Sequence, residues 1–376
     1  MREKNILYIG NFELPDKNAA AHRVLGIAKA LRECGNNVSF VGVNKEDADN
    51  RKENDIILTK KIVQGFDCFS RPYPKCKREW INYLRDISPY IRVVKNIGKI
   101  DVIICYDVSA MLLVKIWRYC RKQGISCVAD DTEWYSTKGR EFPVNIIKGI
   151  DEFFRMRIIQ KRMDGLIVIS RYLERYYRKC RNVVRIPPTV DLSEDKWNNP
   201  YKKDKDILRI VYAGSPGKKD RIDYLVEAVA KISRPYRLDI VGITKKDYLK
   251  SNPLHKSIVS RNANIIFHGY IGHQETLEFI KKANYSCFFR DKDRLSMAGF
   301  PTKFVEAISC GTPVITNDTS DLKKYIREYN GILIKKVSID GIQIALEKAP
   351  FEQKINRENF DYHNFVNKMS MWAINI

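Results

Sequence analysis

The sequence predicts an α/β fold with two doubly wound parallel-sheet domains. Short apolar runs rich in Val and Ile alternate with longer segments whose apolar residues recur at helical spacing. This alternation is typical of parallel strands covered by helices on both faces. The length of 376 residues favours two domains over one, and 44% hydrophobic residues suffice for two buried cores. No segment of about 20 to 50 residues repeats along the chain, so a solenoid is not expected.

The first series of strands lies in the amino-terminal half. We expect a buried strand at 5–10, an amphipathic helix at 22–34 and a second strand at 38–43, which together form a βαβ unit. Further strands are expected at 101–105, 126–129 and 165–170. We therefore assign residues 1–190 to an amino-terminal domain.

A polar segment separates the two halves. Three prolines occur between residues 186 and 206, and the segment has neither helical nor strand periodicity, so we predict a linker at 191–207. A second domain is then expected at 208–359. Its predicted strands are 208–213, 236–242, 264–268, 285–289 and 313–316, and its predicted helices are 222–232, 276–283 and 302–310.

Charge and cysteine content limit the class of protein. With 67 Lys and Arg against 45 Asp and Glu, the net charge is +22, which indicates an anionic partner: nucleic acid, acidic lipid or a phosphorylated substrate. The nine cysteines are scattered without metal-binding spacing, so we expect no disulfide framework or zinc site and a reducing, cytoplasmic location. We also expect no export signal and no membrane-spanning helix, because no apolar run approaches about 18 residues.

Two basic stretches, 70–99 and 140–162, contain interleaved aromatic residues. They allow two interpretations. Either they are helices with solvated charges and aromatic side chains in the core, or they are interfacial helices that contact an anionic membrane surface.

The stretch Gly299–Thr316 (GFPTKFVEAISCGTPVIT) contains a Gly and Pro loop, a helix that stops at Gly311 and a buried strand. We predict Thr302 as the helix N-cap. Lys303 and Glu306 are three residues apart and share one face of the first turns. Because a helix N-terminus attracts anions, this face suits a nucleotide sugar, with Lys303 near phosphate and Glu306 near the ribose hydroxyls. The alternative is an ordinary surface ion pair on a helix.

A second loop, within Val211–Asp223 (VYAGSPGKKDRID), joins a strand to a helix. Its small residues allow the backbone to approach a phosphate, and its lysine pair supplies charge. A basic turn without a ligand is the alternative. If both strand ends open at one edge of a sheet, Lys219 and Lys303 converge on the same phosphates.

These stretches resemble glycosyltransferase family 4, retaining enzymes with the GT-B architecture of two Rossmann-like domains facing a central cleft. The resemblance is to the members that build bacterial capsule and surface polysaccharides. In that family, two glutamates stand eight positions apart around a Gly-Phe step. The chain keeps Gly299, Phe300, Glu306, Ala307, Gly311, Pro313 and Val314. Ala298 stands where the first glutamate belongs, and backbone amides near 298–300 are expected to substitute for it.

The resemblance implies a donor site in the second domain. It implies that Lys219, and secondarily Lys218, bind the donor diphosphate, and Ser215 stands where many relatives have Arg. It also implies that the backbone at Tyr270 and Ile271 recognises the nucleotide base. The expected donor-binding set is Gly214, Ser215, Lys218, Lys219, Tyr270, Ile271, Gly299, Phe300, Thr302, Lys303 and Glu306. The aromatic segment 360–376 is expected to pack back on the first domain.

The acceptor belongs to the first domain in this family. Carboxylates follow two of its predicted strands, Asp107 after one and Asp131 after the next, where one of them would orient the acceptor hydroxyl or take its proton. Both are equally explained as loop caps. The expected catalytic set is Lys219, Lys303, Asp107 and Asp131. We expect no required cofactor or metal, because Asp291-Lys292-Asp293 is too short a match to a DxD motif and such enzymes hold the diphosphate with basic side chains.

The predicted function is transfer of a hexose-type sugar, with retention, from a nucleotide diphosphate sugar to a glycan, or to a glycan on a polyprenyl lipid at the inner face of the membrane. Three alternatives remain. The chain could be a catalytically silent GT-B protein that binds glycan, a nucleotide-sugar epimerase, or a basic nucleic-acid-binding protein. No helix-turn-helix, RRM or KH pattern supports the last, and we expect no nucleic acid partner.

Overall fold

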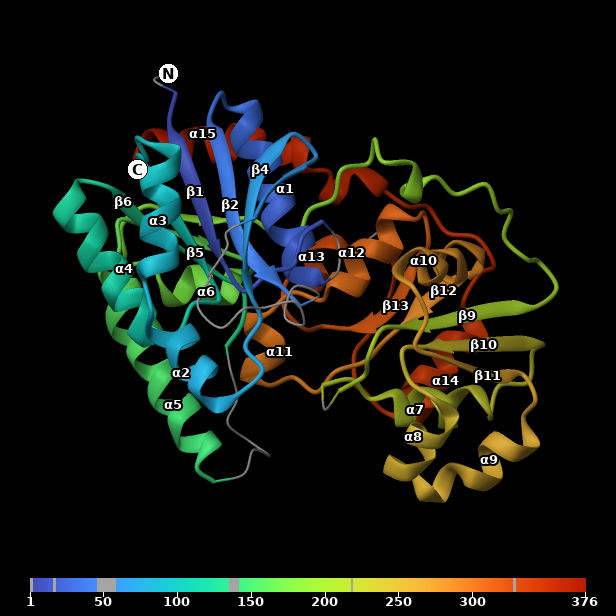
Figure 1. The fold of residues 1–376 in the computed structure, drawn as a ribbon. Coiled ribbons are helices and arrows are strands. Elements are labelled where there is room, and N and C mark those ends of the chain that lie inside the picture. The colour runs from blue at the N-terminus through green and yellow to red at the C-terminus, as the bar shows by residue number, and fades with distance from the viewer. Residues whose placement is uncertain (1–2, 16–17, 46–58, 135–141, 218, 327–328) are drawn as a thin grey trace. The chain divides into compact units, whose positions relative to one another are not determined.

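The computed structural model describes residues 3–15, 18–45, 59–134, 142–217, 219–326 and 329–376. The chain divides into two compact units. Unit 1 comprises Met1–Thr189 and Tyr362–Ile376, and unit 2 comprises Val190–Asp361. Each unit has its own parallel sheet flanked by helices (Figure 1). The α/β class predicted from the sequence is thus confirmed.

In the described part of unit 1, eight strands form one sheet in the order β3-β4-β2-β1-β5-β6-β7-β8, and only β3 runs antiparallel to its neighbour. The strands are β1 (Asn5–Gly10), β2 (Asn37–Asn44), β3 (Thr59–Val63), β4 (Phe66–Pro72), β5 (Val102–Tyr106), β6 (Ser126–Asp131), β7 (Gly165–Val168) and β8 (Val183–Arg185). The helices are α1 (Ala19–Glu33), α2 (Lys77–Arg85), α3 (Ser88–Ile97), α4 (Ala110–Gln123), α5 (Val144–Phe154), α6 (Arg171–Tyr176) and α15 (Val366–Ile374). A π-helical turn, Arg155–Ile159, continues α5.

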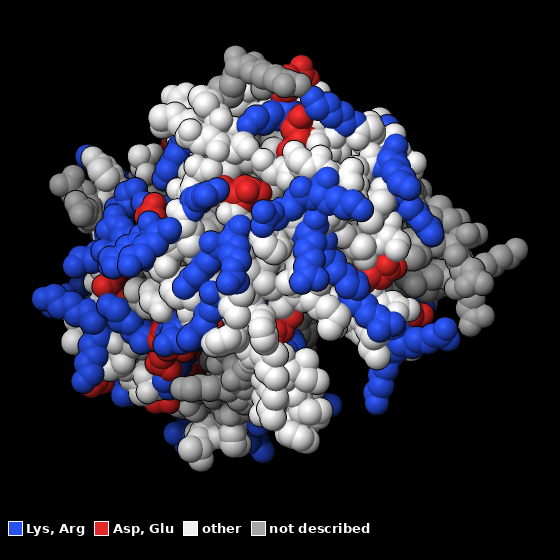
Figure 2. Space-filling model, turned by 90° about the vertical axis from the view of Figure 1, so that its left-hand side faces the viewer, with Lys and Arg blue, Asp and Glu red and all other residues white. Residues whose placement is uncertain are grey.

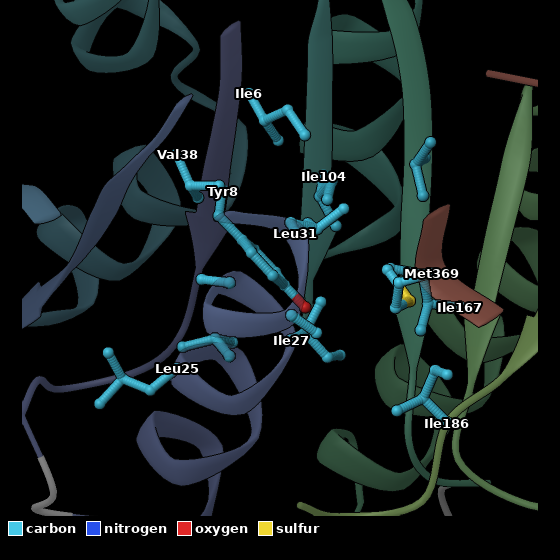
Figure 3. Close-up of a cluster of buried hydrophobic side chains, with 14 of the residues drawn as sticks. Ile6, Tyr8, Leu25, Ile27, Leu31, Val38, Ile104, Ile167, Ile186 and Met369 are labelled. Atoms are coloured by element: carbon cyan, nitrogen blue, oxygen red, sulfur yellow. The ribbon is translucent and has the colours of Figure 1, made fainter. Parts of the chain in front are cut away.

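Helix α1 begins three residues earlier than predicted. The side chain of Asn18 accepts a hydrogen bond from the amide of Ala21 and so caps the helix ahead of Ala19. The apolar face of α1 packs on the sheet, where Leu31 and Ile27 lie close to Tyr8 and Ile104 (Figure 3).

The carboxyl-terminal segment completes the core of unit 1. Met369 and Trp372 of α15 are buried in the same cluster as Ile167 (Figure 3). The indole nitrogen of Trp372 donates to the carbonyl of Asn182 at 2.6 Å, which ties the last helix to the edge of the sheet.

In the described part of unit 2, six parallel strands are ordered β11-β10-β9-β12-β13-β14. They are β9 (Leu208–Ala213), β10 (Tyr236–Val241), β11 (Ile265–Gly269), β12 (Tyr285–Cys287), β13 (Val314–Asn317) and β14 (Gly331–Ile334). The helices are α7 (Ile222–Val229), α8 (Lys245–Ser251), α9 (Lys256–Arg261), α10 (His273–Lys282), α11 (Arg294–Ala298), α12 (Thr302–Ser309), α13 (Leu322–Tyr325) and α14 (Ile339–Lys348).

Residues 191–207, expected as a linker, lie in unit 2. Asn199 donates a hydrogen bond to the carbonyl of Cys310 at 2.8 Å, and the ammonium of Lys203 donates to the carbonyl of Ala283 and the hydroxyl of Thr312. The segment is thus anchored to the base of α12. Among the described residues, no helix combines the length and apolarity that crossing a membrane requires.

Candidate donor and acceptor sites

The strand order of unit 2 has a switch point between β9 and β12. The chain proceeds from β9 outward through β10 to β11, and then returns to place β12 on the other side of β9. In open parallel sheets, ligands bind beyond the carboxyl ends of the strands at such a point. The loops that leave β9 and β12 here are 214–221 and 288–293.

Lys303, from the first turn of α12, lies over the loop after β9. A Cβ atom built on Gly214 would lie 3.8 Å from both Cε and Nζ of Lys303. The Lys303 ammonium donates to the Tyr212 hydroxyl at 2.9 Å and to Oδ2 of Asp220 at 2.5 Å. The two stretches that the sequence singled out are therefore in contact at one edge of one sheet.

Asp220 and Arg290 complete this cluster, and the sequence interpretation missed both. Arg290 follows β12, and its Nε donates to Oδ1 of Asp220 at 2.6 Å. The Arg290 backbone is fixed by two hydrogen bonds with the Asn317 side chain, at 3.0 and 2.8 Å. We define Lys303, Asp220, Arg290 and Tyr212 as the switch-point cluster. One carboxylate faces two cations, so the cluster keeps one net positive charge.

Burial shifts the protonation equilibria of the cluster. The side chain of Lys303 is 11% exposed, and burial lowers the pKa of its ammonium to about 8 despite the attraction of Asp220. Burial opposes ionisation of Asp220 as well, but Lys303 and Arg290 outweigh it and lower the pKa of that carboxyl. Lys303 is thus a cation at neutral pH that an anionic ligand would stabilise further.

The same edge has closely approaching backbones. A Cβ atom on Gly242, which follows β10, would lie 2.5 Å from the carbonyl carbon of Gly214, so only glycine fits there. The amide of Gly242 in turn donates to the carbonyl of Gly269 at 2.7 Å. Glycine at this position thus lets the backbones that follow β9 and β10 approach each other closely.

Thr302 is not the N-cap of α12, contrary to prediction. Pro301 occupies the N-cap position and Thr302 is the first helical residue, with no side-chain cap. The extended conformation of Pro301 suits the position before the helix, so the helix starts one residue earlier than a threonine cap would have it. The first backbone amides of the helix lack partners within the helix, as at any helix N-terminus.

Glu306 does not pair with Lys303. Its Oε1 lies 3.3 Å from Nε2 of His273 at the start of α10, and its side chain is partly exposed. Phe300 is buried in an aromatic group with Phe304, Tyr325 and Phe360. The amide of Gly299 is used by the end of α11, where it donates to the carbonyl of Leu295. Of these expected donor residues, Glu306 presents its side chain most freely.

The other expected donor residues lie in loops along this edge. Ser215 is exposed and Lys219, which directly precedes Asp220, is half-buried, while Lys218 lies outside the described residues. Tyr270 and Ile271 follow β11, with Tyr270 strongly exposed.

The DxD-like run has a structural explanation. Asp293 is the N-cap of α11 and accepts a hydrogen bond from the amide of Ser296 at 2.8 Å. Asp291 lies 3.4 Å from the guanidinium of Arg221. Both carboxylates therefore have local partners, and no step of the chemistry proposed below depends on them.

Unit 1 has its own switch point, between β1 and β5. Asp107 follows β5 there, with a left-handed backbone (φ 46°), and its carboxylate pairs with Nη1 of Arg155 at 3.3 Å. Asp131 is instead the last residue of β6, a strand longer than predicted, where it is buried and accepts a hydrogen bond from the Tyr177 hydroxyl at 2.9 Å. Asp107 is the more accessible of the two predicted carboxylates.

Asp131 supports a pH prediction. Burial raises the pKa of its carboxyl from 3.8 to about 6, outweighing Arg155 and Tyr177. Between about pH 4 and pH 6, the folded chain therefore keeps a proton on Asp131 that the unfolded chain releases. The contribution of this carboxyl to the free energy of unfolding thus falls as pH rises through that range. Asp131→Asn keeps an acceptor for the Tyr177 hydroxyl but cannot titrate. We therefore expect the Tm of the variant minus that of the wild type to increase as pH rises across that window, equivalent to at most about 3 kcal/mol in the free energy of unfolding. Thermal melts of both proteins at a series of pH values measure this. A difference in Tm that does not change with pH contradicts it.

Residues 193–364 match the family model for glycosyl transferases group 1. This match covers nearly all of unit 2. Within it, the switch-point cluster and the Gly299–Thr316 stretch both lie inside the matched residues. The match supports glycosyl transfer as the chemistry of this domain.

Solved structures show the same fold along nearly the whole chain. Sucrose-phosphate synthase from Thermosynechococcus elongatus aligns with a TM-score of 0.71 and 17% identity, covering 99% of this chain and 98% of that one. Anabaena Alr3699/HepE, in complex with UDP and glucose, aligns with a TM-score of 0.66 and 13% identity, covering both chains completely. The lipopolysaccharide outer core galactosyltransferase WaaB aligns with a TM-score of 0.59 and 15% identity, covering 99% of this chain and 97% of that one. No curated protein matches the sequence. These likenesses establish the GT-B fold.

Proposed function

We propose that the chain is a retaining glycosyltransferase that moves a hexose-type sugar from a nucleotide diphosphate sugar to a glycan or lipid-linked glycan acceptor in surface polysaccharide synthesis. The observation that carries the proposal is the switch-point cluster, in which two cations, Lys303 and Arg290, lie at the carboxyl ends of the strands in a unit similar to group 1 glycosyl transferases. A diphosphate is the part of the donor that needs such charge.

The similar structures support the donor class. HepE is described in complex with UDP and glucose, and WaaB is named as a galactosyltransferase of the lipopolysaccharide outer core. On this basis we place the diphosphate against Lys303 and Arg290, with Lys219 at the same loop. Glu306, whose side chain is partly exposed on the next turn of α12, is positioned to accept hydrogen bonds from the ribose.

The proposed reaction breaks the bond between the anomeric carbon and the β-phosphate oxygen. Negative charge develops on that oxygen, and Lys303, Arg290 and the amides at the start of α12 stabilise it. The acceptor hydroxyl attacks the face that the leaving group vacates, which retains the configuration, and its proton passes to the leaving phosphate oxygen. This sequence requires no protein base and no metal or other cofactor.

For the acceptor we propose unit 1. Asp107 at its switch point would orient the acceptor hydroxyl, with Arg155 holding the carboxylate in place. Elsewhere in unit 1, a cavity of about 230 Å³ at the carboxyl ends of β2 and β4 is lined in part by Glu13, Asn44 and Ser70, which suit sugar hydroxyls. All nine cysteines are free thiols, which supports the cytoplasmic location that we propose for the chain.

The proposal is tested with a thermal-shift panel of nucleoside diphosphates and their sugar conjugates. We expect one sugar nucleotide to raise the Tm of the wild type by several degrees, because a ligand that binds only the folded state stabilises it. Glu306→Ala should lose most of that shift, whereas Glu352→Ala, an exposed carboxylate elsewhere in unit 2, should keep it. No shift with any member of the panel contradicts a donor site.

Turnover then separates the alternatives. Release of the nucleoside diphosphate only when a glycan acceptor is present indicates transfer. Binding without any turnover would identify a silent GT-B protein, and conversion of the donor without an acceptor would identify an epimerase.

A further inference from the structure

Two helices of unit 1 bury none of their residues. Among the helices in the described residues, only α2 and α5 have no buried side chain. Yet α5 (VNIIKGIDEFF) is rich in apolar residues, and Ile147, Ile150 and Phe153 are 61%, 53% and 47% exposed. At 100° per residue, these three positions lie within one face about 120° wide.

The side of α5 opposite this face packs on the protein, because Asn145, Gly149 and Glu152 are partly buried there. Oδ1 of Asp151 accepts a hydrogen bond from the amide of Ala110 at 2.7 Å, so this carboxylate caps the amino-terminal end of α4. Asp151 and Glu152 are both partly buried. Helix α5 is therefore oriented opposite to an ordinary surface helix, with its apolar face directed outward.

Helix α2 has the same orientation. Ile81, Leu84 and Trp80 are exposed at 54%, 41% and 37%, while Tyr83 faces the body and receives the guanidinium of Arg71 over its ring. Both helices pack against α4, which lies between them. We define the docking surface as six of the exposed apolar side chains of α2 and α5: Trp80, Ile81, Leu84, Ile147, Ile150 and Phe153.

The charges around the docking surface indicate the chemistry of its binding partner. On α2, α4 and α5 the three carboxylates, Glu79, Asp151 and Glu152, are all partly buried. The cations of these helices are in contrast mostly exposed, among them Lys77, Arg78 and Lys148. Figure 2, which faces the side of the molecule that carries α4 and α5, shows Lys and Arg over much more of the surface than Asp and Glu. Apolar side chains surrounded by outward cations match the acyl region and anionic headgroups of a bilayer.

We infer that α2 and α5 dock unit 1 onto an anionic lipid bilayer. The docking surface adjoins the proposed acceptor carboxylate on both sides. The residue that follows α5 is Arg155, whose guanidinium pairs with Asp107, and the carbonyl of Leu84 accepts a hydrogen bond from the Ser109 hydroxyl at 2.7 Å. Docking would thus present Asp107 to an acceptor carried by lipid. This last step rests on the proposed function, whereas the lipid contact itself does not.

The test is flotation of the full chain with vesicles of phosphatidylcholine alone or of phosphatidylcholine with phosphatidylglycerol. We expect binding to the anionic vesicles that weakens with salt. The triple variant Ile147→Ser/Ile150→Ser/Phe153→Ser should lower the partition coefficient at least about tenfold, because three apolar side chains no longer enter the interface. Ile81→Ser/Leu84→Ser should lower it too, and Lys77→Gln/Arg78→Gln should lower it on anionic vesicles only.

Leu254→Ser is the matched control, since Leu254 is 88% exposed in unit 2 and should not affect flotation. Circular dichroism and Tm show whether the variants are folded. Failure of the wild type to float, or equal flotation of the folded apolar variants, overturns the inference. So does a wild-type dimer that the triple variant dissociates while vesicles do not bind, because the surface would then cover a second copy. Donor shifts in the nucleotide panel are independent of flotation, so the two proposals can fail separately.

Discussion

Replacing Lys303 with alanine is expected to lower kcat/KM for the nucleotide sugar about 10²- to 10³-fold, because removing one preorganised donor to a developing charge costs about 3 to 4 kcal/mol of transition-state stabilisation. Lys303 is suited to this role by its position over Gly214 and its placement between Tyr212 and Asp220. Initial rates across donor concentrations measure the effect. The fold should survive, since Asp220 keeps Arg290 as its partner.

The control for this variant is Lys231→Ala. Lys231 is a half-exposed lysine of unit 2 that lies 3.9 Å from Asp340, so the substitution removes the same charge far from the switch point. We expect its kcat/KM to match the wild type. A folded Lys303→Ala enzyme with wild-type kcat/KM would show that the cation takes no part in the reaction.

Asp220→Asn should lower the free energy of unfolding by about 3 to 5 kcal/mol, because it leaves two largely buried cations without their shared counter-ion. The carboxylate side chain of Asp220 is only 2% exposed, and its two oxygens accept from Arg290 and Lys303 at 2.6 and 2.5 Å. Urea unfolding monitored by tryptophan fluorescence gives the free energy of unfolding. Inorganic pyrophosphate should recover part of the loss, since an anion bound to the two cations replaces the missing charge.

Asp340→Asn provides the comparison, because the Asp340 side chain is 81% exposed and its ion pair with Lys231 is long. We expect it to change stability by less than about 0.5 kcal/mol. A loss for Asp220→Asn as small as that for Asp340→Asn would mean that the cluster contributes little to folding.

The sequence predicts β9 to β13 of unit 2 because parallel strands are continuous apolar runs, but it misses β14. Strand β9 has the predicted bounds Leu208–Ala213. The sequence analysis missed the β3–β4 hairpin. Its two-residue turn, Gln64 and Gly65, has positive φ at both positions and ends in glycine, as is typical of a tight hairpin turn between two strands. That signal was available in the sequence.

The switch-point cluster could be predicted only in part. Lys303 stands in a recognisable block, but Arg290 lies in a charged loop with no motif of its own, and its pairing with Asp220 depends on β9 and β12 being neighbours. Strand adjacency is a tertiary property that local patterns do not contain. The orientation of helix α5 is also a tertiary property. Its periodicity indicates an apolar face but not the direction in which that face points.

Contact between Lys303 and the donor diphosphate can be measured by proton-linked calorimetry. In the protein without ligand, the pKa of Lys303 is about 8. A nucleoside diphosphate that contacts Lys303 should therefore cause its amine to take up a proton when the titration is done above that pH. Titrations in buffers of different ionisation enthalpy should show uptake of a substantial fraction of one proton by the wild type and none by Lys303→Arg, whose guanidinium is always charged. Equal proton uptake by both proteins, or binding without uptake by the wild type, would show that Lys303 does not contact the diphosphate.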